Sequence, residues 1–425
     1  MTTDALRNWA GNHTYPASVV HRPTTVAQVQ EVVAASRRLR AVGTRHSFND
    51  IVDSTALLSL EGLPSLLDID RGSGTVRVGA GVRYAVLAAH LHERGWALHN
   101  LASLPHISVA GAVATASHGS GDRSANLSSA VAGLELVTAD GDQLVLTRAD
   151  AELAGAVVGL GSLGVITALT LEVQPTYDVV QEVHIGLPWS VVLEDLDGVF
   201  GSADSVSLFT DWRGPSVAQV WCKSRIRDGG ARSADPAAWF AARGAVPAVA
   251  PVHPLPGGDA ASTTGQLGVP GPWHERLPHF RTGFVPSAGQ ELQSEYFVDR
   301  RDAAAAIEAV RRLGERLAPV LLVSELRTVA ADDLWLSMAQ GRDSVCLHFT
   351  WRPLQADVEA LLPTLEEALM PFAARPHWGK LFADPTRGVS RLYPRVGDFR
   401  SLVARFDPVG KFGNPYLDRH VFGAS

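Results

Sequence analysis

The spacing of apolar residues changes near residue 177, and this change limits the folds that are open to the chain. Before it, short apolar runs flank turn segments, as at residues 67–78, which is typical of a β-hairpin. After it, longer strands are predicted at residues 206–210, 218–221, 292–298, 320–329 and 345–351. Hairpins mixed with helices favour an α+β fold over a regularly alternating parallel sheet. We therefore expect one domain at residues 1–177 and a second from residue 178.

The second domain is expected to be an antiparallel sheet with helices on one face. Two helical segments, at about residues 301–317 and 355–373, lie between or after its strands. Residues 228–266 are rich in Gly, Ala, Pro and Ser, and no fold is assigned to them.

A histidine lies on the loop that leaves the first predicted strand–helix–strand unit. A short strand at residues 19–20 leads into a helix at residues 25–39, and residues 40–42 return to the sheet. His46 follows on the loop of residues 43–49. Loops that leave a sheet often carry binding groups, although a single histidine of this kind is more often structural.

Charge and composition indicate a protein that acts on a small molecule. The net charge is −7, with acids and bases mixed along the chain, so no surface for nucleic acid or an anionic membrane is expected. No apolar run approaches the roughly 20 residues of a spanning helix, and no signal-peptide pattern is expected at the N-terminus. Two cysteines fit a reduced compartment. We expect a cytoplasmic monomer without nucleic-acid or membrane partners.

Glycine and hydroxyl residues gather between residues 108 and 121. Glycines let a ligand approach the backbone closely, and N–H and O–H groups donate to phosphate, so a diphosphate site is one interpretation and an ordinary loop is the other. A Rossmann site is disfavoured because no G-x-G-x-x-G follows a predicted strand. The residues concerned are Gly111, Gly119 and Gly121 with Ser108, Thr115, Ser117 and Ser120.

Two later strands each carry a polar pair on one face. Because side chains alternate along a strand, Glu325 and Arg327 share a face, as do His348 and Thr350. If the strands are neighbours, this patch suits a substrate with many hydroxyl groups. A solvated surface ion pair is the alternative. Lys380, which follows a predicted helix end, could add a cation to the same patch.

Two other kinds of site lack their sequence signals. The 15 histidines include no H-E-x-x-H run and no Cys/His cluster at ligand spacing, so no metal site is predicted. A G-x-S-x-G elbow, the signal of a serine hydrolase, is also missing.

Long matches along the chain resemble the FAD-dependent alditol oxidases of the vanillyl-alcohol oxidase superfamily. They cover nearly the whole length and are more specific together than any single motif. The matching segments are residues 8–12, 43–49, 100–111, 163–165, 268–276, 375–380 and 407–412.

The resemblance implies a two-domain flavoprotein with a substrate-binding cap at residues 178–380. Residues 1–177 and the C-terminal tail, 381–425, would bind FAD, and His46 would be bonded covalently to the flavin. Arg45 replaces the glycine that usually precedes this histidine. The remaining residues implied for the cofactor are Gly43, Thr44, Arg45, Ser47, Ser103, His106, Ser108, Gly111, Thr115, His118, Gly119, Ile166 and His377.

The resemblance also implies the chemistry. The C1 hydroxyl of a linear polyol such as xylitol or sorbitol would be oxidised to the aldose, with a hydride passing to FAD and O₂ becoming H₂O₂. His348, aided by Lys380, would assist removal of the hydroxyl proton. Ala102 would leave oxygen a path to the flavin or be a packing choice. An aldonolactone oxidase or dehydrogenase and a flavin- or sugar-binding protein without turnover are the alternatives. The substrate-binding residues would be Ser103, Glu325, Arg327, His348, Thr350 and Lys380, with Glu325, Arg327, His348 and Lys380 also catalytic.

Overall fold

Two small sheets form the N-terminal part of the computed structural model, which describes residues 6–227, 230–232, 234–284, 290–384 and 388–423. A parallel three-stranded sheet has the order β1 (Val19–His21), β3 (Ala56–Ser59), β2 (Arg40–Val42). An antiparallel five-stranded sheet has the order β4 (Leu67–Asp70), β5 (Thr75–Gly79), β9 (Val165–Glu172), β7 (Val131–Val137), β8 (Gln143–Thr147). These strands include the predicted hairpins.

Four helices accompany these sheets: α1 (Val26–Ala35), α2 (Tyr84–Glu93), α3 (Val109–Ala114) and α4 (Leu153–Ala156). Helix α1 begins at Thr25, whose side chain accepts from the Gln28 N–H, and buries Val29 and Val33. The prediction that this helix reaches residue 39 is wrong, because Ser36 is extended and its N–H closes the last turn at Ala35.

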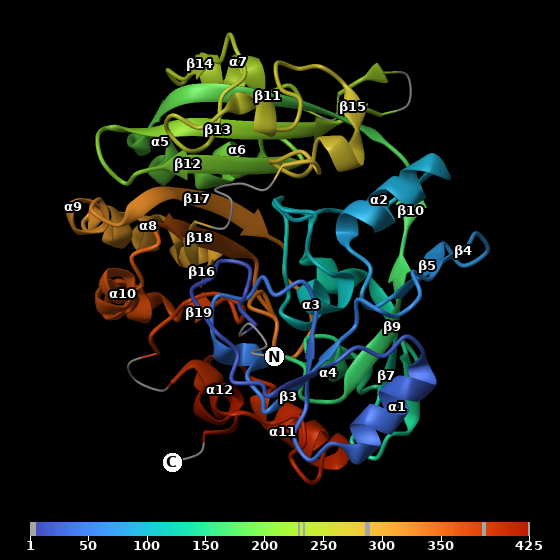
Figure 1. Ribbon diagram of the computed structural model, residues 1–425. Helices are drawn as coiled ribbons and strands as arrows, with labels where there is room; N and C mark the ends of the chain where they lie inside the picture. The colour runs from blue at the N-terminus through green and yellow to red at the C-terminus, as the bar shows by residue number, and fades with distance from the viewer. Residues whose placement is uncertain (1–5, 228–229, 233, 285–289, 385–387, 424–425) are drawn as a thin grey trace.

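A nine-stranded, predominantly antiparallel sheet forms the upper part of the molecule in Figure 1. The antiparallel architecture is as predicted. Helices α5 (Trp189–Glu194), α8 (Ala303–Arg311) and α10 (Gln355–Leu369) pack on its apolar face. The strand order is β14 (Val246–Pro247), β11 (Asp178–Pro188), β13 (Ser216–Arg225), β12 (Ser205–Thr210), β17 (Leu321–Val329), β18 (Ser344–Trp351), β16 (Leu292–Asp299), β19 (Arg375–Pro376), with β15 (Gly271–Pro272) on β11.

The two helices predicted for this part are shorter than expected. The segment 301–317 contains α8 and a separate α9 (Gly314–Leu317), because the Leu313 N–H donates to the Val310 carbonyl oxygen in a tighter turn between them. At the start of α9, Gly314 approaches Trp212 so closely that a Cβ would lie 2.8 Å from the Trp212 carbonyl oxygen. Helix α10 ends at Leu369, and Pro371 follows in a 3₁₀ turn. The segment left unassigned contains α7 (Pro236–Ala241) and β14.

The C-terminal tail returns to the N-terminal part, as the red helices beside the blue segments show in Figure 1. Phe399 and Leu402 of α11 (Val396–Phe406) and Tyr416 of α12 (Pro415–Leu417) join its hydrophobic core. The Lys411 ammonium donates to the carbonyl oxygens of Val33 and Ala139. The tail therefore packs with the first 177 residues, although about 200 residues separate them in sequence.

Strand register places the polar residues of the large sheet in one row. Glu325 pairs with His348, and His348 pairs on its other side with Glu295 of β16. Directly opposed side chains of neighbouring strands project from the same face. The two polar strand faces predicted from sequence are thus adjacent, and a third strand extends the row.

Candidate active site

One cavity lies between the polar face of the large sheet and the loops of the N-terminal part. One wall comes from β16, β17 and β18, and the other from the loop after β2 and from the segments on both sides of α3. Most residues predicted for a site line it: Gly43, Thr44, Arg45, His46, Ser47, Ser103, Ser108, Gly111, Thr115, His118, Ile166, Glu325, Arg327, His348, Thr350, His377 and Lys380.

Two residues predicted to contact the cofactor are not among those that line the cavity. His106 Nε2 lies 2.6 Å from the carbonyl oxygen of Thr282, at the edge of the site. Gly119 packs directly on the backbone of Leu101: an added Cβ would lie 2.5 Å from the Leu101 carbonyl oxygen. Its lack of a side chain therefore permits close packing of two chain segments.

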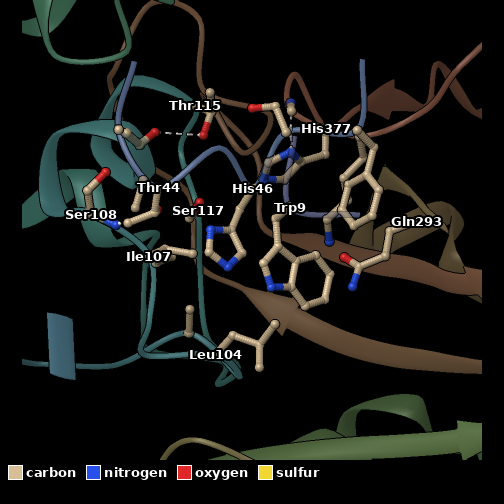
Figure 2. A pocket seen from close by; sticks show the side chains of 18 of the residues that line it. Trp9, Thr44, His46, Leu104, Ile107, Ser108, Thr115, Ser117, Gln293 and His377 are labelled. Atoms are coloured by element: carbon tan, nitrogen blue, oxygen red, sulfur yellow. Dashed lines mark hydrogen bonds between the residues drawn. The ribbon is translucent and has the colours of Figure 1, made fainter. Parts of the chain in front are cut away.

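His46 points into the cavity beside Trp9, as Figure 2 shows. The two rings stack with centroids 5.1 Å apart, and His46 Nδ1 is buried without a hydrogen-bond partner among the described residues. Burial, together with the neighbouring His106, lowers the pKa of His46 to about 4. The imidazole is therefore neutral at physiological pH, and its Nδ1 carries no hydrogen bond that would compete with a bond to a cofactor.

Arg45 has a backbone conformation that favours glycine. Its φ is +62°, in the left-handed region, which is strained for a residue with a Cβ. The side chain donates to the carbonyl oxygen of Arg7 at 3.3 Å, while the Arg45 carbonyl accepts from the Trp9 N–H. The half-buried Arg45 side chain therefore links the His46 loop to the N-terminal segment.

The loop of His46 is tied to the segment that carries Lys380. Phe48 N–H donates to the carbonyl oxygen of Gly379 at 2.8 Å, and the Asn49 side chain donates to those of Trp378 and Lys380. These bonds fix the histidine loop against the far wall of the cavity. The relative placement of the two walls therefore depends on backbone hydrogen bonds between distant segments.

The hydroxyl-rich segment lies against the loop after β2. A Cβ on Gly43 would lie 2.2 Å from Ser108 Oγ, and the Ser108 N–H donates to Thr44 Oγ1 at 3.1 Å. Thr115 and Ser117 also line the cavity. This wall therefore offers a backbone that a ligand can approach closely, hydroxyl donors and the unpartnered Nδ1 of His46. These groups together fit a flavin dinucleotide.

Glu295 is the centre of charge on the sheet wall. Its fully buried carboxylate accepts from Lys380 Nζ and Arg327 Nη2, both at 2.7 Å, and lies 3.2 Å from His118 Nε2. Burial alone would raise its pKa, but Lys380, His118 and Arg327 hold the pKa well below the usual value. Glu295 is therefore a carboxylate that balances two buried cations.

Glu325 and Arg327 are buried, which excludes a solvated surface ion pair. Arg327 Nε lies 3.5 Å from Glu325 Oε1, and Arg327 Nη1 donates to Ser103 Oγ at 3.3 Å. Burial tends to raise the pKa of Glu325, but Arg327 and His279 lower it below the usual range. The pair thus presents a carboxylate and a guanidinium to the cavity in a region of low dielectric.

His348 lies between Lys380 and Thr350. Lys380 Nζ is 2.9 Å from His348 Nδ1, and Thr350 Oγ1 is 3.2 Å from His348 Nε2. Burial and the neighbouring Lys380 lower the pKa of His348 to about 4, and burial also lowers the pKa of Lys380 although Glu295 opposes it. A neutral imidazole next to a lysine whose proton is easier to remove is suited to acid–base chemistry.

The sequence analysis missed several residues that line this cavity, among them Trp9, His279, Gln293 and Glu295. Gln293 and Glu295 had a usable signal, because they alternate on one face of a predicted strand in the same way as the two polar pairs that were recognised. His279 and Trp9 lie outside regular strands, and no local pattern indicates their positions.

Two features are absent from the residues that the structure describes. No group of three or more His, Cys, Asp or Glu side chains could hold a metal ion within the described ranges. In the same part of the chain, no helix has the length and apolar character needed to cross a bilayer.

Family models match both halves of the chain. Residues 17–147 match the FAD binding domain, and residues 289–420 match D-arabinono-1,4-lactone oxidase. The first match contains the His46 loop and α3, and the second contains β16, β17, β18 and Lys380. The two matches therefore lie on the two walls of the cavity.

Relatives match the chain along almost its full length. It is 49% identical to an alditol oxidase of Streptomyces sp. over 97% of this chain and 98% of that protein. It is 31% identical to an L-gulono-1,4-lactone dehydrogenase of Mycobacterium tuberculosis over 98% of each chain.

Solved structures support the fold at low identity. Cholesterol oxidase from B. sterolicum is 14% identical, with a TM-score of 0.78 over 98% of this chain and 96% of that chain. A solvent-stable cholesterol oxidase gives the same TM-score at 15% identity, over 98% and 97% of the two chains. The predicted α+β flavoprotein fold is confirmed. From the extent and identity of these matches, the chain belongs to the alditol oxidase family of FAD-dependent oxidoreductases, within the vanillyl-alcohol oxidase superfamily.

Proposed function

We propose that the protein oxidises the C1 hydroxyl of a linear polyol, such as xylitol or sorbitol, to the aldose while O₂ is reduced to H₂O₂. The observation that carries this proposal is the buried row of Glu325, His348 and Glu295, facing the His46 loop across one cavity. Carboxylate, guanidinium, imidazole and ammonium groups suit a ligand with several hydroxyls. Similarity to an alditol oxidase supports the same choice.

The domain boundaries belong to this proposal. Residues 1–177 with the tail 381–425 would form the flavin-binding unit, and residues 178–380 the substrate-binding cap. In support, the large sheet takes its strands from residues 178–376, and the tail packs in the core of the N-terminal sheets.

FAD would be held along the wall of α3 and the loop after β2, with a covalent bond to His46. The support is the neutral imidazole, its buried and unpartnered Nδ1, and the close approach of Gly43 to Ser108. Bound FAD supplies the hydride acceptor for the substrate carbon and passes the electrons to O₂.

The cap residues would bind and deprotonate the substrate. Glu325 would accept a hydrogen bond from one substrate hydroxyl, and Arg327 would donate to another. Ser103 and Thr350 would complete the orientation of the substrate. The reactive form would be the one in which Lys380 has released its proton, a step that burial favours by lowering the pKa of Lys380. In that form the Nδ1–H of His348 donates to Nζ and leaves the Nε2 lone pair for the C1 hydroxyl. Transfer of that proton to Nε2, coupled to transfer of the Nδ1 proton to Nζ, leaves His348 neutral and an ammonium 2.7 Å from Glu295.

A stepwise experiment tests this function. Xylitol or sorbitol mixed anaerobically with the purified yellow protein is expected to bleach the flavin spectrum, and admission of air should restore the colour with one H₂O₂ per aldose. An unbleached spectrum with both polyols would contradict the proposal and favour a binder without turnover. Flavin that remains with acid-precipitated protein, and is released in a His46→Ala variant, would support the covalent bond; complete release from the parent protein would contradict it.

The second candidate is an aldonolactone oxidase or dehydrogenase. It is favoured by the match of residues 289–420 to the D-arabinono-1,4-lactone oxidase model and by the 31% identical lactone dehydrogenase. Bleaching by L-gulono-1,4-lactone without bleaching by either polyol would select it, and slow reoxidation by O₂ would indicate a dehydrogenase.

A further inference from the structure

A chain of three buried polar side chains leads from the interior of the cap to the substrate cavity. Lys223 of β13 lies 3.2 Å from His279 Nδ1, and His279 Nε2 lies 2.8 Å from Glu325 Oε1. Glu325 and His279 line the substrate cavity, whereas Lys223 lines a second polar cavity that also includes Arg225 and Ser205. Neither Lys223 nor His279 contributes to the deprotonation described above.

The partners of these groups fix the direction of each hydrogen bond. The Lys223 ammonium has three N–H donors and three acceptors, namely the carbonyl oxygens of Leu277 and Pro278 and His279 Nδ1. Since an ammonium has no lone pair, His279 Nδ1 must accept. Burial and the charge of Lys223 lower the pKa of His279 to about 4, so the neutral ring carries its single proton on Nε2. That proton is donated to the Glu325 carboxylate.

Aromatic rings hold the imidazole in this orientation. Phe209 and Trp221 meet the His279 ring edge-on, with centroid distances of 5.4 and 5.3 Å. Phe209 is also the strand partner of Glu325 across β12 and β17. Rotation of the ring would require both aromatic side chains to move in a close-packed core.

We propose that Lys223 and His279 are positioning residues that prepare Glu325 to bind a substrate hydroxyl. The hydrogen bond from His279 and the ion pair with Arg327 both reach Glu325 Oε1. Oε2 is then the oxygen that accepts from the substrate, and its direction is set by the bond at Oε1. A substrate needs a second hydroxyl beyond the reacting one to use this contact. The oriented Glu325 carboxylate therefore favours polyols over simple alcohols. This inference rests on the proposed polyol oxidation.

The reductive half-reaction with xylitol separates binding from chemistry. Rapid anaerobic mixing gives the dissociation constant of xylitol and the rate of flavin reduction. The experiment is run at about pH 6, where most Lys223 is charged, because burial lowers the pKa of Lys223 to about 7. His279→Leu is expected to raise the dissociation constant about tenfold while the reduction rate changes by less than about threefold. His279→Gln, whose amide N–H can replace the Nε2 donor, is expected to recover most of the affinity. Lys223→Met tests the same chain if His279→Leu does not fold.

A matched control comes from another buried histidine. His184 of β11 is buried, stacks on Phe240 at 4.8 Å, and has no hydrogen-bond partner at either ring nitrogen among the described residues. His184→Leu therefore removes a buried imidazole without removing a hydrogen bond, and the affinity for xylitol should not change. Parent-like affinity in His279→Leu and Lys223→Met, or failure of His279→Gln to recover affinity lost in His279→Leu, would overturn the inference. Failure of the parent to be reduced by xylitol would instead overturn the proposed function.

Discussion

Replacement of Glu295 by glutamine would test whether this carboxylate balances the charges of the active site. Glutamine keeps the side-chain volume but removes the negative charge. Its NH₂ group would also face the N–H donors of Lys380 and Arg327, from which it cannot accept a hydrogen bond. Lys380 and Arg327, both 2.7 Å from the Glu295 carboxylate, would then share Glu325 as the remaining nearby carboxylate. Loss of one partner from a buried ion pair costs about 3–5 kcal/mol, because the remaining charge stays desolvated.

Calorimetry and kinetics would measure the effect together. A loss of about 3 kcal/mol should lower the unfolding temperature of this 425-residue chain by about 3 °C or more, because the entropy of unfolding is about 2.1 cal/mol/K per residue. If the same energy orients Lys380 and Arg327 during catalysis, kcat/KM for xylitol should fall about 100-fold or more. Glu135→Gln is the matched control, because it breaks a partly exposed carboxylate–guanidinium pair with Arg77 and should change both values little.

A double variant, Glu295→Gln with Lys380→Met, would show whether the lost stability comes from an uncompensated charge. Adding Lys380→Met to Glu295→Gln removes one of the uncompensated cations, so part of the lost stability should return while activity stays low. An unfolding temperature for Glu295→Gln equal to that of Glu135→Gln would refute the reasoning, since the buried cations would then not depend on Glu295.

Three further predictions concern the loops and the acid response. Arg45→Gly should leave the proposed flavin bond to His46 intact and change stability by less than about 1 kcal/mol, because relief of the positive φ offsets the entropy of glycine. Arg45→Val should lose flavin on denaturing gels, because a β-branched residue is strained at this φ. Gly119→Ala should destabilise by about 1–3 kcal/mol in thermal unfolding, while Gly397→Ala, with open space at its Cβ, should not. The unfolding temperature should fall as the pH drops from about 6.5 toward 4, because the pKa of His348 is about 4 in the folded protein and near 6.5 in the unfolded chain, which therefore binds the proton first. His348→Asn should make this dependence less steep, and an unchanged dependence would contradict the buried neutral imidazole.

The two polar strand faces could be found from sequence because alternation along a strand is a local property. The two-residue repeat of a strand is enough to predict that Glu325 and Arg327 share one face and that His348 and Thr350 share another. The structure adds that the two strands are neighbours, with Glu325 opposite His348. The same rule applied to β16 would have found Glu295. Helix ends were predicted less well, because apolar spacing does not reveal the tight turn at Leu313 that separates α8 from α9.

The amino-acid sequence alone determined the fold class, the family and many residues of the cavity, because hydrophobic periodicity and long motifs are written in consecutive residues. Only the tertiary structure decided that Glu295 joins Lys380, Arg327 and His118, that Trp9 stacks on His46, and that Lys223 reaches Glu325 through His279. These contacts join residues that lie far apart in the chain. Their partners and pKa shifts arise from burial in a shared low-dielectric interior, which no local pattern encodes.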